Sequence, residues 1–177
     1  MRLRRQLFAL VLAAGCQSSS LPSPCPGQAL GTLVFTGVPS ASDGGTCYFA
    51  SDAGTAFTAE IASGSGTSAY LCAQRTDAAP FEGTLEGDHL VLSSTFPPND
   101  VAGCNCLVVV TETVQGDLER ALGPGTPVTG FDGGLTVDIV PAPDAGTCEP
   151  VSSVPDAGPS CGVPCEVQQG LVGSQGP

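Results

Sequence analysis

Basic residues, tryptophan and histidine are scarce in this sequence. It contains no lysine and no tryptophan, and it has a single histidine. Three of its five basic residues, Arg2, Arg4 and Arg5, lie at the amino terminus, and the seventeen acidic residues give a formal net charge of −12. Proteins that bind nucleic acids use basic residues to displace counterions from phosphate groups. The lack of basic residues therefore argues against nucleic acid as a partner.

The presence of a single histidine also limits the classes of enzyme to which this chain could belong. A Ser-His-Asp triad needs a histidine beside its nucleophile. The single histidine, His89, alternates with Leu90, so we expect it to point to solvent from a strand. We therefore predict that the chain has no catalytic residue and is not an enzyme.

Acidic side chains keep one class of enzyme open as an alternative. Glycoside hydrolases use two carboxyl groups about 5–10 Å apart, and Glu82, Glu86, Asp88 and Glu112 are the candidates for such a pair. Acids on the outer face of a sheet normally solvate it and discourage edge pairing. Sugar-binding sites commonly use aromatic side chains as stacking platforms, whereas this sequence has only two tyrosines and no tryptophan.

No apolar run is long enough for a membrane-spanning helix, which needs roughly twenty residues. The apolar run from Leu7 to Ala14 follows the three amino-terminal arginines and precedes Gly15 and Cys16. A basic start, a short apolar stretch and small residues before a cleavage point are typical of a secretory signal. Residues 1–15 are therefore expected to be a signal peptide.

The end of this segment, Leu12-Ala13-Ala14-Gly15-Cys16, resembles the lipobox of bacterial lipoproteins, with the leucine one place earlier than usual. The resemblance implies cleavage before Cys16, diacylglycerol on its sulfur and a further acyl chain, such as palmitate, on the new amino terminus. No other cofactor is expected. Two or three acyl chains hold a protein firmly on a membrane. Gln17 resembles the residue found in the class sorted to the outer membrane, on its periplasmic face or at the cell surface.

Cysteine is abundant, with nine residues. If Cys16 is lipidated, an even number remains, which predicts a disulfide framework in an exported chain. Eight cysteines allow 105 pairings, and their connectivity stays open: Cys25, Cys47, Cys72, Cys104, Cys106, Cys148, Cys161 and Cys165. The close pairs do not have the spacing of paired zinc ligands or of a Cys-x-x-Cys redox motif. We therefore predict no metal site.

Short runs of alternating apolar and polar residues follow one another between residues 30 and 141. Examples are Leu33 to Phe35, Phe57 to Ile61, a hairpin from Phe81 to Thr95, the run from Cys106 to Leu118, and Leu135 to Ile139. Such alternation, with turns rich in Gly and Asp, is typical of strands. The prediction is an all-β antiparallel meander of roughly eight strands, forming a sandwich or a small barrel that disulfides staple.

The flanking segments differ in composition. Residues 16–29 are rich in Ser and Pro and suit a tether, whereas residues 142–177 are rich in Pro, Gly and Cys. Because few large apolar residues occur after 141, we expect irregular structure there and disorder over the last eight or so residues. Two Asp-x-Gly units, at Asp43 and Asp144, favour turns over calcium loops, since each supplies one carboxylate.

These observations predict a lipid-anchored envelope protein, most simply a non-catalytic binding or interaction module with an envelope protein as a partner. The hydrolase remains an alternative, and so does a small-ligand-binding barrel. Without tryptophan, the Gly-x-Trp signature of lipocalins is absent.

Overall fold

The computed structural model describes residues 25–38, 56–73, 79–100, 106–123, 125–145, 148 and 163–176. In these residues the chain forms nine β-strands: β1 (Gln28–Val38), β2 (Phe57–Ser63), β3 (Ser68–Ala73), β4 (Phe81–Glu86), β5 (His89–Thr95), β6 (Asn99–Asp100), β7 (Leu107–Arg120), β8 (Val128–Pro141) and β9 (Cys165–Ser174). The described residues include no helix long and apolar enough to cross a membrane.

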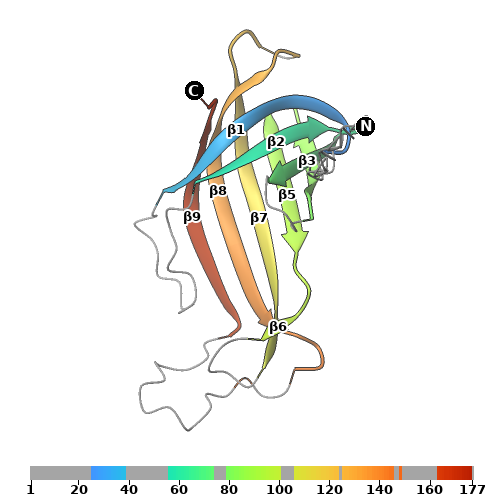
Figure 1. Ribbon diagram of the computed structural model, residues 1–177, viewed down its shortest axis with the longest axis vertical. Helices are drawn as coiled ribbons and strands as arrows, with labels where there is room; N and C mark the ends of the chain where they lie inside the picture. The colour runs from blue at the N-terminus through green and yellow to red at the C-terminus, as the bar shows by residue number, and fades with distance from the viewer. Residues whose placement is uncertain are drawn as a thin grey trace, which may run out of the picture.

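Eight of these strands close into an antiparallel barrel (Figure 1). From β1 to β5 each strand pairs with the next, β5 then pairs with β7, and β7, β8 and β9 continue in order. Pairing of β9 with β1 closes the ring, and the two-residue strand β6 adds to β7 outside it. The all-β antiparallel meander is therefore confirmed, and it takes the form of a barrel.

The barrel has two unlike ends. The β2–β3, β4–β5 and β7–β8 connections meet at one end, the turn end, where the Leu85 N–H donates to Thr67 O and the Leu118 N–H donates to Asp88 O. At the opposite end, β7 and β8, with 14 residues each, and β9, with 10, continue past the strands of six or seven residues. Figure 1 shows this three-stranded extension as the lower part of the molecule. We call the three-stranded part the extension and this end of the barrel the extension end.

The main core fills the barrel interior with alternate residues of its strands. Its buried members are Leu33, Phe35, Ala59, Ile61, Ala69, Leu71, Phe81, Leu90, Leu92, Val114, Leu118, Val128, Phe131 and Leu171. Phe35 and Phe131 meet edge to face with ring centroids 5.5 Å apart. Gly116 and Gly133 pair across β7 and β8, and a Cβ on either would lie 2.7 Å from Cζ of Phe131. Side chains therefore occupy this part of the barrel, as is usual for eight strands.

A second, smaller core lies on the extension. Cys106, Val108, Ile139 and Cys165 are buried there, and Cys148 packs against them. A disulfide joins Cys106 to Cys148, with their Cα atoms 4.9 Å apart. The cross-link ties the segment after β8 to the start of β7. This part of β7 extends beyond the shorter strands, so they do not cover it.

Strand β9 corrects the prediction for the carboxyl-terminal segment. Residues 142–177 were expected to lie outside the β-domain with a disordered end, but β9 pairs with β8 along its whole length and with β1 from Gly170 to Ser174. Its strand pattern is interrupted, because Gln169 and Gly173 occupy interior positions between or after Val167 and Leu171. At Gly173 a Cβ would lie 3.1 Å from the side chains of Leu33, Phe35 and Phe131. The crowded core leaves no room for the large apolar residue that would mark a strand.

Candidate functional site

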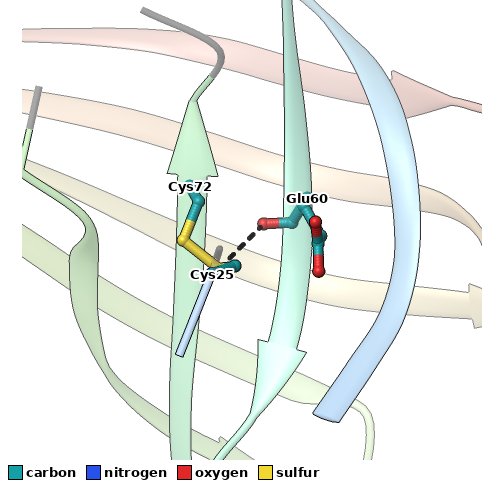
Figure 2. The surroundings of a disulfide bond; sticks show 3 residues. All are labelled: Cys25, Glu60 and Cys72. Atoms are coloured by element: carbon teal, nitrogen blue, oxygen red, sulfur yellow. Dashed lines mark hydrogen bonds between the residues drawn. A yellow bond between two sulfur atoms is a disulfide. The ribbon is translucent and has the colours of Figure 1, made fainter. Parts of the chain in front are cut away.

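Two of the disulfides can be described in full, because both cysteines of each lie in the described residues. Cys25 is bonded to Cys72 on β3, with Cα atoms 5.7 Å apart across 47 positions of sequence, and Cys25 Sγ lies 3.9 Å from the carbonyl oxygen of Glu60 (Figure 2). Cys106 is bonded to Cys148, and Cys165 is disulfide-bonded as well. The remaining predicted cysteines lie outside the described residues: Cys16, Cys47, Cys104 and Cys161. Because such bonds persist in oxidising compartments, they indicate an extracytoplasmic protein.

The four acids considered for hydrolysis do not converge. Glu82 and Glu86 are exposed on the outer face of β4. Asp88, in the β4–β5 turn, accepts a hydrogen bond of 2.7 Å from Nε of Arg120. Glu112 lies two residues before the buried Val114 on β7. Residues two apart on a strand share a face, so Glu112 stands at an interior-facing position. A pair of carboxyl groups aimed at one bond is not formed by these four residues.

Glu112 belongs to a polar layer in an otherwise apolar interior. In the register of the barrel it stands between Ser94 on β5 and Val137 on β8. Ser94 is the buried polar residue of the described core. This layer lies between the main core and the smaller core of the extension.

His89 is exposed on β5, as its alternation with Leu90 predicts. Its Nδ1 lies 2.9 Å from Oδ1 of Asp117, and its Nε2 lies 3.4 Å from the side-chain amide of Gln115, both on β7. In the neutral ring, Nδ1–H can donate to the carboxylate while Nε2 accepts from the amide. The ring therefore bridges Asp117 and Gln115 on the outer face of β5 and β7.

One motif escaped the sequence reasoning. Residues 158–162, Gly-Pro-Ser-Cys-Gly, have the Gly-x-Ser-x-Gly spacing of a nucleophile elbow. The elbow needs a sharp turn from a strand into a helix, and these residues lie outside the described part of the chain. The spacing alone does not make a triad.

The outer face of β4, β7, β8 and β9 carries a concentration of acids that we call the acidic wall. It consists of Glu82, Glu86, Asp117, Glu119, Asp132, Asp138 and Glu166. Asp117 stands directly opposite Asp132, and Asp138 directly opposite Glu166. Like charges at such positions destabilise a sheet, each by roughly 0.2–1 kcal/mol. His89 is the only basic side chain on this wall among the described residues.

The acids of the wall are spread out. In the described part of the chain, no three His, Cys, Asp or Glu side chains come together as metal ligands would. The wall is therefore an extended charged surface.

Arg120 is a residue that sequence reasoning did not single out. Its side chain is 7% exposed and donates to Asp88 through Nε and to the carbonyl of Thr126 through a terminal nitrogen. It is one of only two arginines after residue 15, in a chain without lysine. The scarcity of basic residues is the sequence feature that could have singled out Arg120. Its position ties the β4–β5 turn to the β7–β8 hairpin at the turn end.

The β7–β8 hairpin carries the most exposed large apolar side chain of the described residues. Leu122 is 87% exposed, whereas Val38, Leu107, Val140 and Val172 are 38–45% exposed.

Comparison with protein-family models, curated proteins and solved structures finds no match.

Proposed function

We propose that this protein is a lipoprotein of the bacterial outer membrane whose barrel is a non-catalytic interaction module. The observation that carries the second part is the acidic wall. Its seven acids are not matched by any Lys or Arg on that wall in the described strands, so the wall suits an envelope protein with a basic surface. Complementary charge steers association and selects partners more than it sets affinity.

The first part of the proposal comes from the lipobox-like segment ending at Cys16 and is supported by the disulfides. Disulfides indicate export, and an exported chain with a lipidated cysteine is held by its acyl chains. The chain must be held this way because its acids would be repelled by anionic head groups.

Interaction accounts for the geometry better than hydrolysis does. Glu82 and Glu86 face outward and Glu112 faces inward, so a substrate on either face would meet only part of the set. Around Phe131 the described core is filled by side chains, because a Cβ at Gly116 or Gly133 would lie 2.7 Å from the Phe131 ring. Small-ligand binding stays a second candidate at one place, the polar layer of Ser94 and Glu112.

The anchor is tested by metabolic labelling with a fatty acid. We expect the wild-type chain to be labelled and the Cys16→Ser variant to be unlabelled, with both exported and oxidised. Labelling of Cys16→Ser would contradict the anchor.

The interaction is tested by cross-linking in native envelopes. The wall variant Glu86→Gln/Asp132→Asn removes two exposed charges, and the control Asp100→Asn/Asp144→Asn removes two exposed charges away from the wall. One protein recovered near stoichiometrically with the wild type and the control, but not with the wall variant, supports the proposal. Recovery should also fall as ionic strength rises.

Equal recovery with both variants contradicts a role for the wall, and recovery of nothing specific contradicts the interaction module. A small molecule that protects the wild type against unfolding, but not Glu112→Gln, would favour the second candidate.

A further inference from the structure

The acidic wall borders an exposed apolar surface on β1 and β9. Val38 on β1 is 44% exposed, and Val172 on β9 is 45% exposed. Val38 stands opposite Gly170, whereas Val172 stands two residues further along β9, opposite Thr36. The two valines are therefore diagonal neighbours on one face, close enough for one long side chain to touch both. We call them the valine pair.

A hollow lies beside the valine pair. Gly134 on β8 stands opposite Gly170 on β9, on the same outer face. A Cβ at Gly134 would lie 3.4 Å from the backbone oxygen of Gln169, and no side chain from another strand of the described part comes within 4 Å of that position. A Cβ at Gly170 would lie 3.4 Å from Cβ of Val38. The hollow therefore has a floor of backbone and an apolar edge.

Another glycine on the same face of β8 shows what a filled position looks like. At Gly130 a Cβ would lie 2.5 Å from Oε2 of Glu119, and Gly130 is buried. The side chain of Glu119 covers Gly130, so packing within the chain explains that glycine. Gly134 has room for a Cβ and does not have a positive φ, although glycine weakens a strand. Glycine in a strand can mark the close approach of a ligand or another chain, which suits the hollow.

A carboxylate stands at one side of the hollow. Asp132 precedes Gly134 by two residues on β8, shares its face and lies directly opposite Val172. It is exposed and has no ion-pair partner among the described residues, whereas Asp117, which faces it across β7 and β8, is held by Nδ1 of His89 at 2.9 Å. An apolar edge, an open backbone floor and an unpaired carboxylate together suit a cation that carries an apolar stem.

We propose that the hollow binds an arginine side chain of the partner protein. The aliphatic stem lies over Gly134 and Gly170 against the valine pair, and the guanidinium binds Asp132. This inference rests on the proposed interaction module and names the side chain that its partner presents.

Arginine fits this position for three reasons. Its stem covers apolar surface while its charged head stays in water, its planar fork matches a carboxylate, and it is common among the residues that dominate binding energy at interfaces. A cation at Asp132 also offsets the repulsion between Asp132 and Asp117. A second copy of this chain is a poorer occupant, because it would bring one acidic wall against another.

Small cations test the stem and the charge separately. The probes are guanidinium, butylguanidinium and butylammonium, and the readout is the shift of backbone amide NMR signals in the full, oxidised chain in neutral detergent. We expect butylguanidinium to move the signals of Gly134, Gly170 and Val172 in a saturable way. It should bind about ten-fold more tightly than guanidinium, because each fully buried methylene strengthens binding roughly four-fold. Butylammonium should bind more weakly than butylguanidinium.

Gly134→Val fills the hollow without changing a charge, and β-branched residues suit strands. The matched control Ser93→Val adds the same side chain at an exposed outer position of β5. We expect Gly134→Val to lower the affinity for butylguanidinium to that for guanidinium, and Ser93→Val to leave both affinities unchanged. Asp132→Asn should weaken both cations. Unfolding midpoints confirm that each variant is folded.

Equal binding of butylguanidinium by the wild type and Gly134→Val would overturn the inference, and so would equal affinities for any two of the three probes. Cross-linking in envelopes separates this inference from the proposed function. Loss of the captured protein with Gly134→Val, but not with Ser93→Val, supports the arginine site. Loss only with Glu86→Gln/Asp132→Asn keeps the interaction module and overturns the arginine site. If no specific protein is captured, the interaction module is wrong and the inference falls with it.

Discussion

The ion pair at the turn end predicts that its two partners are not equivalent. The side chain of Arg120 is 7% exposed, whereas that of Asp88 is 44% exposed. Removing the charge of Asp88 leaves a buried guanidinium whose one other hydrogen-bond partner among the described residues is the carbonyl of Thr126. Removing Arg120 leaves a carboxylate that water can still reach. Substitution of Asp88, the more exposed partner, should therefore lower the free energy of unfolding more than substitution of Arg120.

The magnitude follows from the degree of burial. Loss of one partner of a fully buried pair costs about 3–5 kcal/mol, whereas an exposed pair contributes about 0–1 kcal/mol. Because one partner is buried and the other is half exposed, we expect Asp88→Asn to lower the free energy of unfolding by about 2 kcal/mol. Arg120→Met keeps the packing of the aliphatic stem and should cost about 1 kcal/mol or less.

Denaturant unfolding of the oxidised proteins measures both values, with unchanged slopes as the check that the transitions are comparable. Asp88→Asn should cost little once Arg120→Met is present, so that the double-mutant cycle gives a coupling energy of at least about 1 kcal/mol. A cost of Arg120→Met that exceeds that of Asp88→Asn would refute the reasoning, and so would additive costs.

Three further predictions concern the barrel wall and its cross-link. Gly133→Ala should destabilise the barrel by about 3 kcal/mol or more, because its Cβ would lie 2.2 Å from a backbone oxygen of β7, whereas the neighbouring Gly134→Ala, at 3.4 Å from a backbone oxygen of β9, should be tolerated in the same unfolding assay. Asp132→Asn should raise the free energy of unfolding by about 0.2–1 kcal/mol, less in high salt, because it relieves repulsion across the sheet; a loss of stability would contradict this. Replacing Cys25 and Cys72 together by serine should cost about 4 kcal/mol, since the bond closes 47 positions of sequence; an unchanged unfolding midpoint would show that it does not restrain the unfolded chain.

Much of the fold could be read from alternation. The runs at Leu33 to Phe35, Phe57 to Ile61, Phe81 to Thr95 and Cys106 to Leu118 fall on β1, β2, β4 with β5, and β7. The choice between sandwich and barrel could not be read, because closure depends on β9, which pairs across most of the chain with β1. In β9 the apolar alternation of Cys165, Val167 and Leu171 is broken by Gln169 and ends at Gly173, and only the bulk of the neighbours of Gly173 shows why glycine is required.

The candidate site was harder to predict for a related reason. On β7 the apolar run from Leu107 to Val110 occupies both faces, so it does not show which face Glu112 shares. Its interior position becomes evident only from Val114 and from its partner Ser94 on β5. Disulfide formation could be predicted from cysteine number, but the Cys25–Cys72 bond also needs the path of the chain over β2 and β3.

The acidic wall connects stability with function. The facing pairs Asp117–Asp132 and Asp138–Glu166 each oppose the fold, and neither is needed to pair strands whose interior residues already specify the register. Features that cost stability without serving the fold are where function is expected. If the wall is the interaction surface, Asp132→Asn should therefore make the barrel more stable and the captured partner weaker at the same time. Such a trade-off separates a functional surface from charges that only solvate the protein, because neutralising a purely solvating charge would change stability and leave recovery of the partner unaltered.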